Sequence, residues 1–171
     1  PRVDDATAFL RLDLVHGLGP ITATRLIEAF GSPGAVFERS MAELIGVEDV
    51  GSERARRLCD PALAAAVEEE RALCHREGVR IVTQADADYP AALRHLADPP
   101  LALWLRGELV DRDRLAIAVV GPRKPSAYGH RQARRFALGL ARSGACIVSG
   151  LARGVDTVAH AAVLAAEGRT V

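Results

Sequence analysis

The stretch of residues 115–121 reads LAIAVVG, and it decides the fold class. Six consecutive apolar residues followed by a glycine are typical of a strand covered on both faces, as in a parallel sheet. The sequence then predicts a helix over residues 128–143, a strand over 146–148, a helix over 156–167 and a further strand from 169. This alternation favours an α/β, Rossmann-like fold with an extended, parallel, doubly wound sheet. The sheet is incomplete at residue 171, so we interpret the chain as a truncated part of that fold.

The residues before this stretch have a different pattern. Residues 6–75 read as short helices joined by glycine-containing turns, without the alternation that marks strands. From residue 80 the period changes, and residues 80–83 and 101–105 are strand candidates. We therefore expect a small all-α domain over residues 1–77 and the first part of the Rossmann-like domain over residues 78–171.

The helical part contains a turn of the form hGhGxxxAxxL, in which h is an apolar residue. It includes Gly17 and Gly19, and a degraded second copy over residues 49–58 has Asp49 in place of the first glycine. A glycine-rich turn exposes backbone N–H groups at a helix N-terminus, where a phosphate can bind. Gly17 and Gly19 are therefore candidate secondary phosphate contacts of a SAM-like, helix-hairpin-helix domain, whereas the alternative is a simple helix connector.

The charge of the chain is unevenly distributed. The 22 basic and 22 acidic residues give a net charge of zero. Residues 1–100 hold 11 basic and 17 acidic residues, which is −6, and residues 101–171 hold 11 and 5, which is +6. Because association with a polyanion depends on the local field, the positive part favours an anion-binding surface.

Several classes of protein are disfavoured by what the sequence lacks. Cys59, Cys74 and Cys146 have neither disulfide nor zinc-ligand spacing, so we expect no metal and a reducing, cytoplasmic location. No apolar run approaches the roughly 18 residues of a membrane span. The five histidines are scattered, so no catalytic residue and no cofactor are expected. His160 is expected to pair with Asp156 on one helix face, and Asp156 to cap that helix.

Two loops follow neighbouring strands of the expected sheet, and ligands of parallel sheets bind beyond the carboxyl ends of strands. Neither loop has the dinucleotide-binding or Walker A spacing. Their cations, hydroxyls and glycines predict an anion pocket, and the nucleic-acid-binding candidates are Gly121, Arg123, Lys124, Ser126, Ser149, Gly150, Arg153 and Gly154.

The helix between the two loops has two distinct faces. Ala133, Phe136, Ala137 and Leu140 form the expected packing stripe. Arg131 and Arg135 lie on the opposite face, either as solvated charges or as secondary phosphate contacts. Tyr128 is the one ring beside the loops that is available for base stacking.

The order of these motifs resembles the DprA/Smf family, the bacterial DNA-processing proteins of natural transformation. The resemblance rests on VVGPR at residues 119–123 and SGLARGVD at residues 149–156, with Tyr89-Pro90, Asp98-Pro99-Pro100 and Arg106-Gly107 before them. It departs from the family pattern at Pro122, where a small residue is usual and where proline has no N–H to offer.

The resemblance implies a binding protein and not an enzyme. It implies that the chain holds single-stranded DNA at the carboxyl ends of the β-strands, with Arg123 in contact with a DNA phosphate. It also implies that the protein protects incoming DNA and loads RecA onto it for recombination. It further implies that single-strand-binding protein is a partner, which is displaced from the DNA. It also implies a homodimer formed through the Rossmann domain. The alternative from another class is a Rossmann-type nucleotide-binding enzyme similar to nucleoside-monophosphate phosphoribohydrolases.

Overall fold

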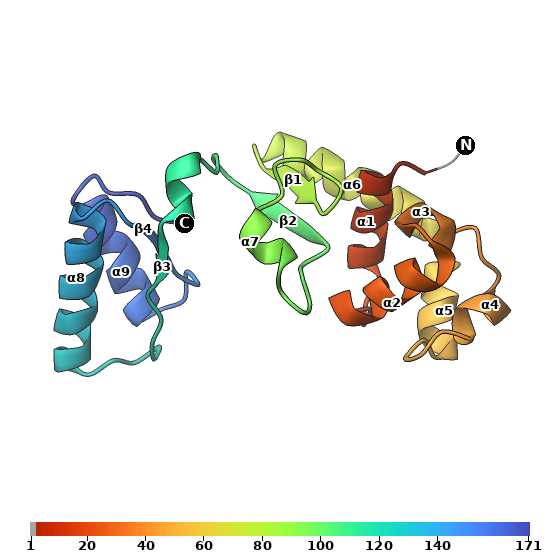
Figure 1. The fold of residues 1–171 in the computed structure, drawn as a ribbon, viewed down its shortest axis with the longest axis horizontal. Coiled ribbons are helices and arrows are strands. Elements are labelled where there is room, and N and C mark those ends of the chain that lie inside the picture. The colour runs from red at the N-terminus through yellow and green to blue at the C-terminus, as the bar shows by residue number, and fades with distance from the viewer. Residues whose placement is uncertain (1–2) are drawn as a thin grey trace. The chain divides into compact units, whose positions relative to one another are not determined.

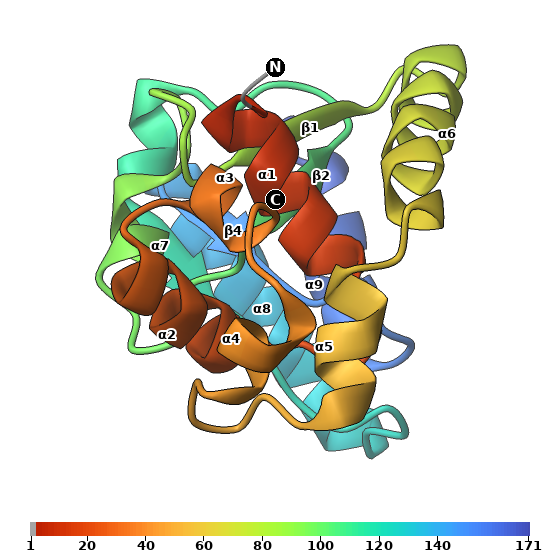
Figure 2. The same cartoon turned by 90° about the vertical axis from the view of Figure 1, so that its right-hand side faces the viewer.

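The computed structural model describes residues 3–171, and the chain forms two compact units that divide between Gly107 and Glu108 (Figure 1). The described part of the first unit contains α1 (Asp5–Leu14), α2 (Pro20–Phe30), α3 (Pro33–Val36), α4 (Met41–Ile45), α5 (Ser52–Leu58), α6 (Ala62–Arg76), β1 (Arg80–Thr83), α7 (Ala91–Arg94) and β2 (Ala102–Leu105). Figure 2 shows the short helices α2, α4 and α5 in front of the viewer.

Local side chains determine where these helices begin and end. The Asp4 carboxylate accepts a hydrogen bond from the N–H of Thr7 at 2.9 Å and so caps α1. Ser40 and Glu43 form a reciprocal capping box at the start of α4. Gly31 ends α2 with a φ of +87°, a left-handed conformation that favours glycine. The positions of the helices therefore follow from signals that the sequence itself carries.

The two strands of the first unit, β1 and β2, form a sheet of their own. β1 and β2 pair antiparallel, with Arg80 opposite Leu105 and Thr83 opposite Ala102, and they pack against α1 and α6. They form a separate two-stranded sheet and do not join the parallel sheet. Their buried apolar residues, such as Val82, belong to the first unit. The domain boundary between residues 77 and 78 stays a prediction, and the compact units divide at Gly107.

The second unit contains β3 (Ala116–Ala118), α8 (Ala127–Arg142), β4 (Cys146–Val148) and α9 (Val155–Leu164). β3 and β4 are parallel, and a parallel bridge from Ile147 to Thr170 begins a third strand on the other side of β4. The strand–helix–strand–helix–strand order predicted from the sequence is thus confirmed. α9 ends at Leu164, earlier than expected.

Both helices of the second unit pack against the same face of the parallel strands. Ile117 and Ile147 are paired across β3 and β4, and they share one apolar cluster with Ala137 of α8 and Val163 of α9. Phe136, predicted to pack in this stripe, is 60% exposed instead. The buried residues of α8 are Ala133 and Ala137, and Phe136 belongs to neither apolar cluster of the second unit.

A partly buried ion pair closes the second unit at the opposite end of the strands. The Arg169 guanidinium lies 2.6 Å from the carboxylate of Asp113, which belongs to a short 3₁₀ helix (Asp111–Arg114) before β3. Hydrogen bonding from Arg169 holds the pKa of Asp113 well below its usual range. The pair therefore joins the start of β3 to the third strand. No helix within residues 3–171 is long and apolar enough to cross a bilayer.

Candidate nucleic-acid interface

The two loops at the carboxyl ends of β3 and β4 touch backbone to backbone. The N–H of Val155 donates to the carbonyl oxygen of Pro122 at 3.3 Å. Gly154 has a φ of +94°, and a Cβ at this position would lie 2.7 Å from the carbonyl carbon of Arg123. The prediction that these loops lie side by side is confirmed, and Gly154 is the residue that permits the contact.

Gly121 has a packing role in the same contact. A Cβ at Gly121 would lie 2.7 Å from the Cγ2 of Val155, the first residue of α9. The first loop can therefore pass over the start of α9 only with glycine at this position. The carbonyl of Pro122 serves the inter-loop hydrogen bond, so the proline ring does not disturb the join between the loops.

Asp156 organises the second loop, and its predicted role as a helix cap is wrong. Gly154 occupies the cap position of α9, whereas Asp156 lies inside the first turn and is only 7% exposed. Its Oδ2 accepts hydrogen bonds from the N–H of Gly150 at 3.2 Å and of Ala152 at 3.4 Å. The carboxylate thus holds the residues on both sides of Leu151.

Ser149 and His160 also make structural contacts. The Ser149 hydroxyl donates to the carbonyl oxygen of Val119 at 2.6 Å, so its single proton is used to join the ends of the two strands. The predicted pairing of His160 with Asp156 is wrong, because His160 Nδ1 lies 2.7 Å from Thr170 Oγ1. The Thr170 hydroxyl donates to the carbonyl oxygen of Ile147, so Nδ1 of His160 is the donor in the first contact.

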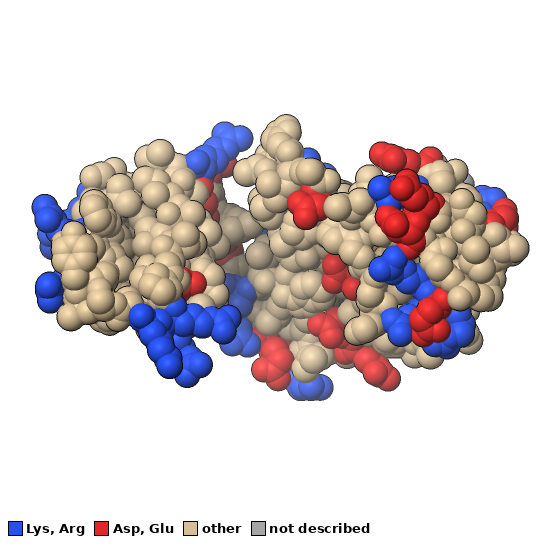
Figure 3. All heavy atoms as spheres, turned by 90° about the horizontal axis from the view of Figure 1, so that it is seen from below, with Lys and Arg blue, Asp and Glu red and all other residues tan. Residues whose placement is uncertain are grey.

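The cations at the loops are free to meet a ligand. Arg123, Lys124 and Arg153 are exposed, and none has a carboxylate within 4 Å among residues 3–171. In the first unit, by contrast, exposed arginines pair with neighbouring carboxylates, as Arg39 does with Glu43. Figure 3 shows the difference: the charged residues visible on the second unit are mainly Lys and Arg, whereas both signs lie side by side on the first. The loop end therefore carries an unneutralised positive field.

Helix α8 continues this basic surface away from the loops. Ser126 begins the helix by accepting a hydrogen bond from the N–H of Gly129 at 3.1 Å. Arg131 and Arg135 are exposed and Ala133 and Ala137 are buried, as predicted, whereas Phe136 of the predicted packing stripe is exposed. Tyr128 at the same end is 64% exposed.

Two apolar residues of the loops were missed by the sequence interpretation. Val120 is 75% exposed and Leu151 is 82% exposed, and Leu151 has a φ of +54°. The available signal was an apolar residue placed directly after Gly150 in a turn, where a polar residue is more usual.

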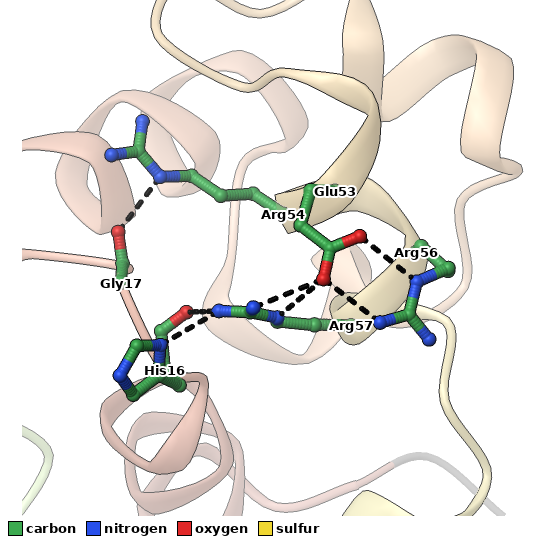
Figure 4. Close-up of polar contacts among 6 residues, drawn as sticks. All are labelled: His16, Gly17, Glu53, Arg54, Arg56 and Arg57. Atoms are coloured by element: carbon green, nitrogen blue, oxygen red, sulfur yellow. Dashed lines mark hydrogen bonds and ion pairs between the residues drawn. The ribbon is translucent and has the colours of Figure 1, made fainter.

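The helix-hairpin-helix turns of the first unit contact each other through arginines (Figure 4). Arg57 donates to the carbonyl oxygen of His16 at 2.6 Å and lies 2.8 Å from its Nδ1. Arg54 donates to the carbonyl oxygen of Gly17 at 2.7 Å. Glu53 binds Arg57 and Arg56, and the hydrogen bond from Arg56 lowers the pKa of Glu53 to about 2.

The contact is reciprocal because the two motifs are copies of each other. Arg25 occupies in the first motif the position that Arg57 occupies in the second, and Arg25 forms an ion pair with Asp49 in the second turn. The equivalent apolar positions are all buried in one core: Leu18 and Val50, Ala23 and Ala55, Leu26 and Leu58. The arginines nearest the turns thus join the two motifs, and the phosphate contacts expected at Gly17 and Gly19 stay predictions.

No group of three or more metal-ligand side chains with suitable geometry occurs in the described part of the chain.

Residues 80–171 match the family model of DNA recombination-mediator protein A, and residues 9–74 match a SAM-like helix-hairpin-helix tandem. The chain belongs to the DNA recombination-mediator protein A family. Both loops at the strand ends lie inside the segment that matches DNA recombination-mediator protein A.

Curated relatives include proteins named DprA and Smf. The chain is 36% identical over 171 residues to the putative DNA processing protein DprA of Mycobacterium tuberculosis, covering 92% of this chain and 39% of that protein. It is 46% identical over 88 residues to the protein Smf of Escherichia coli, covering 51% and 24%. The chain thus spans less than half the length of these relatives. The resemblance to the DprA/Smf family is confirmed.

A solved relative has the same fold. The X-ray structure of DNA processing protein A from Streptococcus pneumoniae superposes with a TM-score of 0.61 at 25% identity, over 99% of this chain and 57% of that one. The α/β fold class with a preceding helix-hairpin-helix tandem is therefore shown for this member of the DNA recombination-mediator protein A family.

Proposed function

We propose that this chain binds single-stranded DNA at the carboxyl ends of β3 and β4, as part of DNA processing in natural transformation. One observation carries the proposal: two loops of the family segment are joined backbone to backbone and present Arg123, Lys124 and Arg153 to solvent without a carboxylate partner among the described residues. The name of the Mycobacterium tuberculosis relative, a putative DNA processing protein, supports the choice of polyanion.

The loops offer two kinds of contact to a strand. The guanidinium groups of Arg123 and Arg153 and the ammonium of Lys124 bind phosphate oxygens by charge-assisted hydrogen bonds. Gly154 keeps the two loops in contact, and Ser126 retains a hydroxyl proton that it can donate to a phosphate oxygen. The N–H of Gly150 is already bound by Asp156, so this N–H is not available to a phosphate.

Single strands are favoured over duplex because the basic surface is accompanied by an exposed ring. Tyr128, 64% exposed at the start of α8, gives an unstacked base a face on which to rest. Arg131 and Arg135 extend the phosphate contacts along the outer face of the same helix. With few rings available, binding is dominated by the backbone and tolerates any base sequence.

A binding role is supported over catalysis by the partners of the polar groups beside the loops. The Ser149 hydroxyl, the Asp156 carboxylate and the Nδ1 of His160 are each engaged in a hydrogen bond that holds the fold. Loading of RecA, protection of the incoming strand, displacement of single-strand-binding protein and formation of a homodimer are proposals that rest on membership of the family.

The salt dependence of binding tests the proposal. For the Arg123→Ala variant we expect weaker binding to a single-stranded oligonucleotide of about 30 nucleotides, and a slope of log affinity against log salt that is smaller by about 0.7, the value of one phosphate contact on single strands. Arg112→Ala is the matched control, because Arg112 is equally exposed but lies before β3, at the other end of the strand. Equal slopes for wild type and Arg123→Ala would contradict the proposal.

A further inference from the structure

Leu151 is the most exposed of the large apolar residues described, at 82%, and it lies at the tip of the second loop. Its φ of +54° places it in the left-handed region, which is unfavourable for an L-residue other than glycine, asparagine or aspartate. An exposed leucine in this conformation gains nothing from burial and adds strain to the backbone. Such strain at a loop tip is found where a residue is presented to a ligand.

The surrounding contacts hold Leu151 in this conformation. Asp156 Oδ2 accepts hydrogen bonds from the residues on both sides, Gly150 at 3.2 Å and Ala152 at 3.4 Å. The carbonyl oxygen of Ala152 accepts from the hydroxyl of Thr157 at 2.8 Å and from its N–H at 3.1 Å. The first turn of α9 therefore fixes both flanks of the leucine and leaves its side chain in solvent.

The charges around Leu151 indicate what it contacts. Arg153 is two residues away, and the backbone of Arg123 lies against Gly154 of the same loop. An apolar partner protein would leave these cations unpaired, and a simple inorganic anion would leave the leucine uncovered. An unstacked nucleobase with its phosphates supplies both an apolar face and negative charge.

We propose that Leu151 packs against an unstacked base of the strand that is bound at the two loops, and that Asp156 is the positioning residue for this contact. The inference rests on the proposed function, because the cations must hold the phosphates of the same strand. It adds a base contact, independent of charge, to a site whose other contacts are electrostatic.

The substitution Leu151→Asn separates this role from folding. Asparagine tolerates the left-handed conformation, so the melting temperature is expected to stay the same or rise. Affinity for the oligonucleotide is expected to fall on the order of tenfold, since burial of a leucine side chain is lost, while the salt slope stays unchanged. Leu115→Asn is the matched control: Leu115 is 60% exposed, precedes β3, and is expected to leave affinity unchanged.

An oligonucleotide of the same length with abasic sugars tests the base contact directly. Wild-type protein is expected to bind the normal strand about tenfold more tightly than the abasic strand, and Leu151→Asn and Asp156→Ala are each expected to reduce this preference. In the double variant, Leu151→Asn is expected to cause no loss of base preference beyond that of Asp156→Ala, because both substitutions remove the same leucine–base contact.

Equal wild-type affinity for normal and abasic strands would overturn the role of Leu151 and leave the phosphate site intact. If Leu151→Asn lowers the melting temperature and retains the preference for the normal strand, the leucine serves folding. That result would also overturn the proposed base contact. If wild-type protein binds neither strand, the proposed function fails and the inference fails with it.

Discussion

Replacing Gly154 by alanine tests whether the two loops are held together as the structure shows. Gly154 has φ +94° and ψ −127°, and a non-glycine residue in such a sparsely populated region costs about 1–3 kcal/mol. The added Cβ would also lie 2.7 Å from the carbonyl carbon and oxygen of Arg123 and against the carbonyl oxygen of Pro122. Because all three atoms belong to backbone, relief requires separation of the loops, at a further cost of about 1–3 kcal/mol.

The two costs, less about 0.4–1 kcal/mol for the stiffer unfolded chain of alanine, predict a loss of about 1–5 kcal/mol. For a unit of this size the melting temperature would fall by at least about 4 °C. Far-ultraviolet circular dichroism during urea or thermal unfolding is the suitable assay, because the single tryptophan, Trp104, lies in the first unit.

Gly139 provides the matched control for this substitution. It lies inside α8, and a Cβ there would have no atom within 4 Å. Gly139→Ala should therefore stabilise the protein, by up to about 1 kcal/mol, because alanine is the better helix former. If Gly154→Ala proves as stable as wild type, the close contact between the loops is refuted as the reason for glycine at this position.

Two further predictions concern the ion pairs. Arg169 lowers the pKa of Asp113, so this carboxyl contributes stability above its unfolded pKa and loses the contribution as the pH falls toward its folded pKa. Asp113→Asn should therefore be less stable than wild type at pH 7 and lose less stability on acidification below about pH 4. Urea unfolding at several pH values measures this, and parallel curves of unfolding free energy against pH for the two proteins would contradict the pairing. Arg57→Ala removes the hydrogen bonds to His16 and should cost the first unit about 0.5–1.5 kcal/mol, measured by Trp104 fluorescence, with Arg76→Ala as an exposed control that should change little.

The elements that the sequence predicts correctly are those with local signals. The strands predicted at residues 80–83 and 146–148 have the same bounds in the structure, because each is a short run dominated by apolar and β-branched residues. The parallel pairing of the later strands also follows from the alternation of strand and helix. These features depend on residues that are close to one another in the sequence.

The features that the sequence could not predict depend on contacts between distant residues. The pairing of β1 with β2 outside the parallel sheet depends on packing against α1 and α6. The exposure of Phe136 depends on which residues of α9 face α8, since helical periodicity alone places it beside Ala137. The sequence signal at Leu151 is an apolar residue in a turn, but its positive φ could not be predicted, because Asp156, five residues later, holds the loop in that conformation.

The backbone contact between the loops has a consequence for the rate of binding. No side chain separates Gly154 from Arg123, so no rotamer change can part the two loops. The backbone of the proposed site is thus preorganised, and a DNA strand that binds there orders the exposed cation side chains but not the loops that carry them. Association should then be limited by diffusion and steering, and variants that weaken individual contacts should differ mainly in how long the strand stays bound.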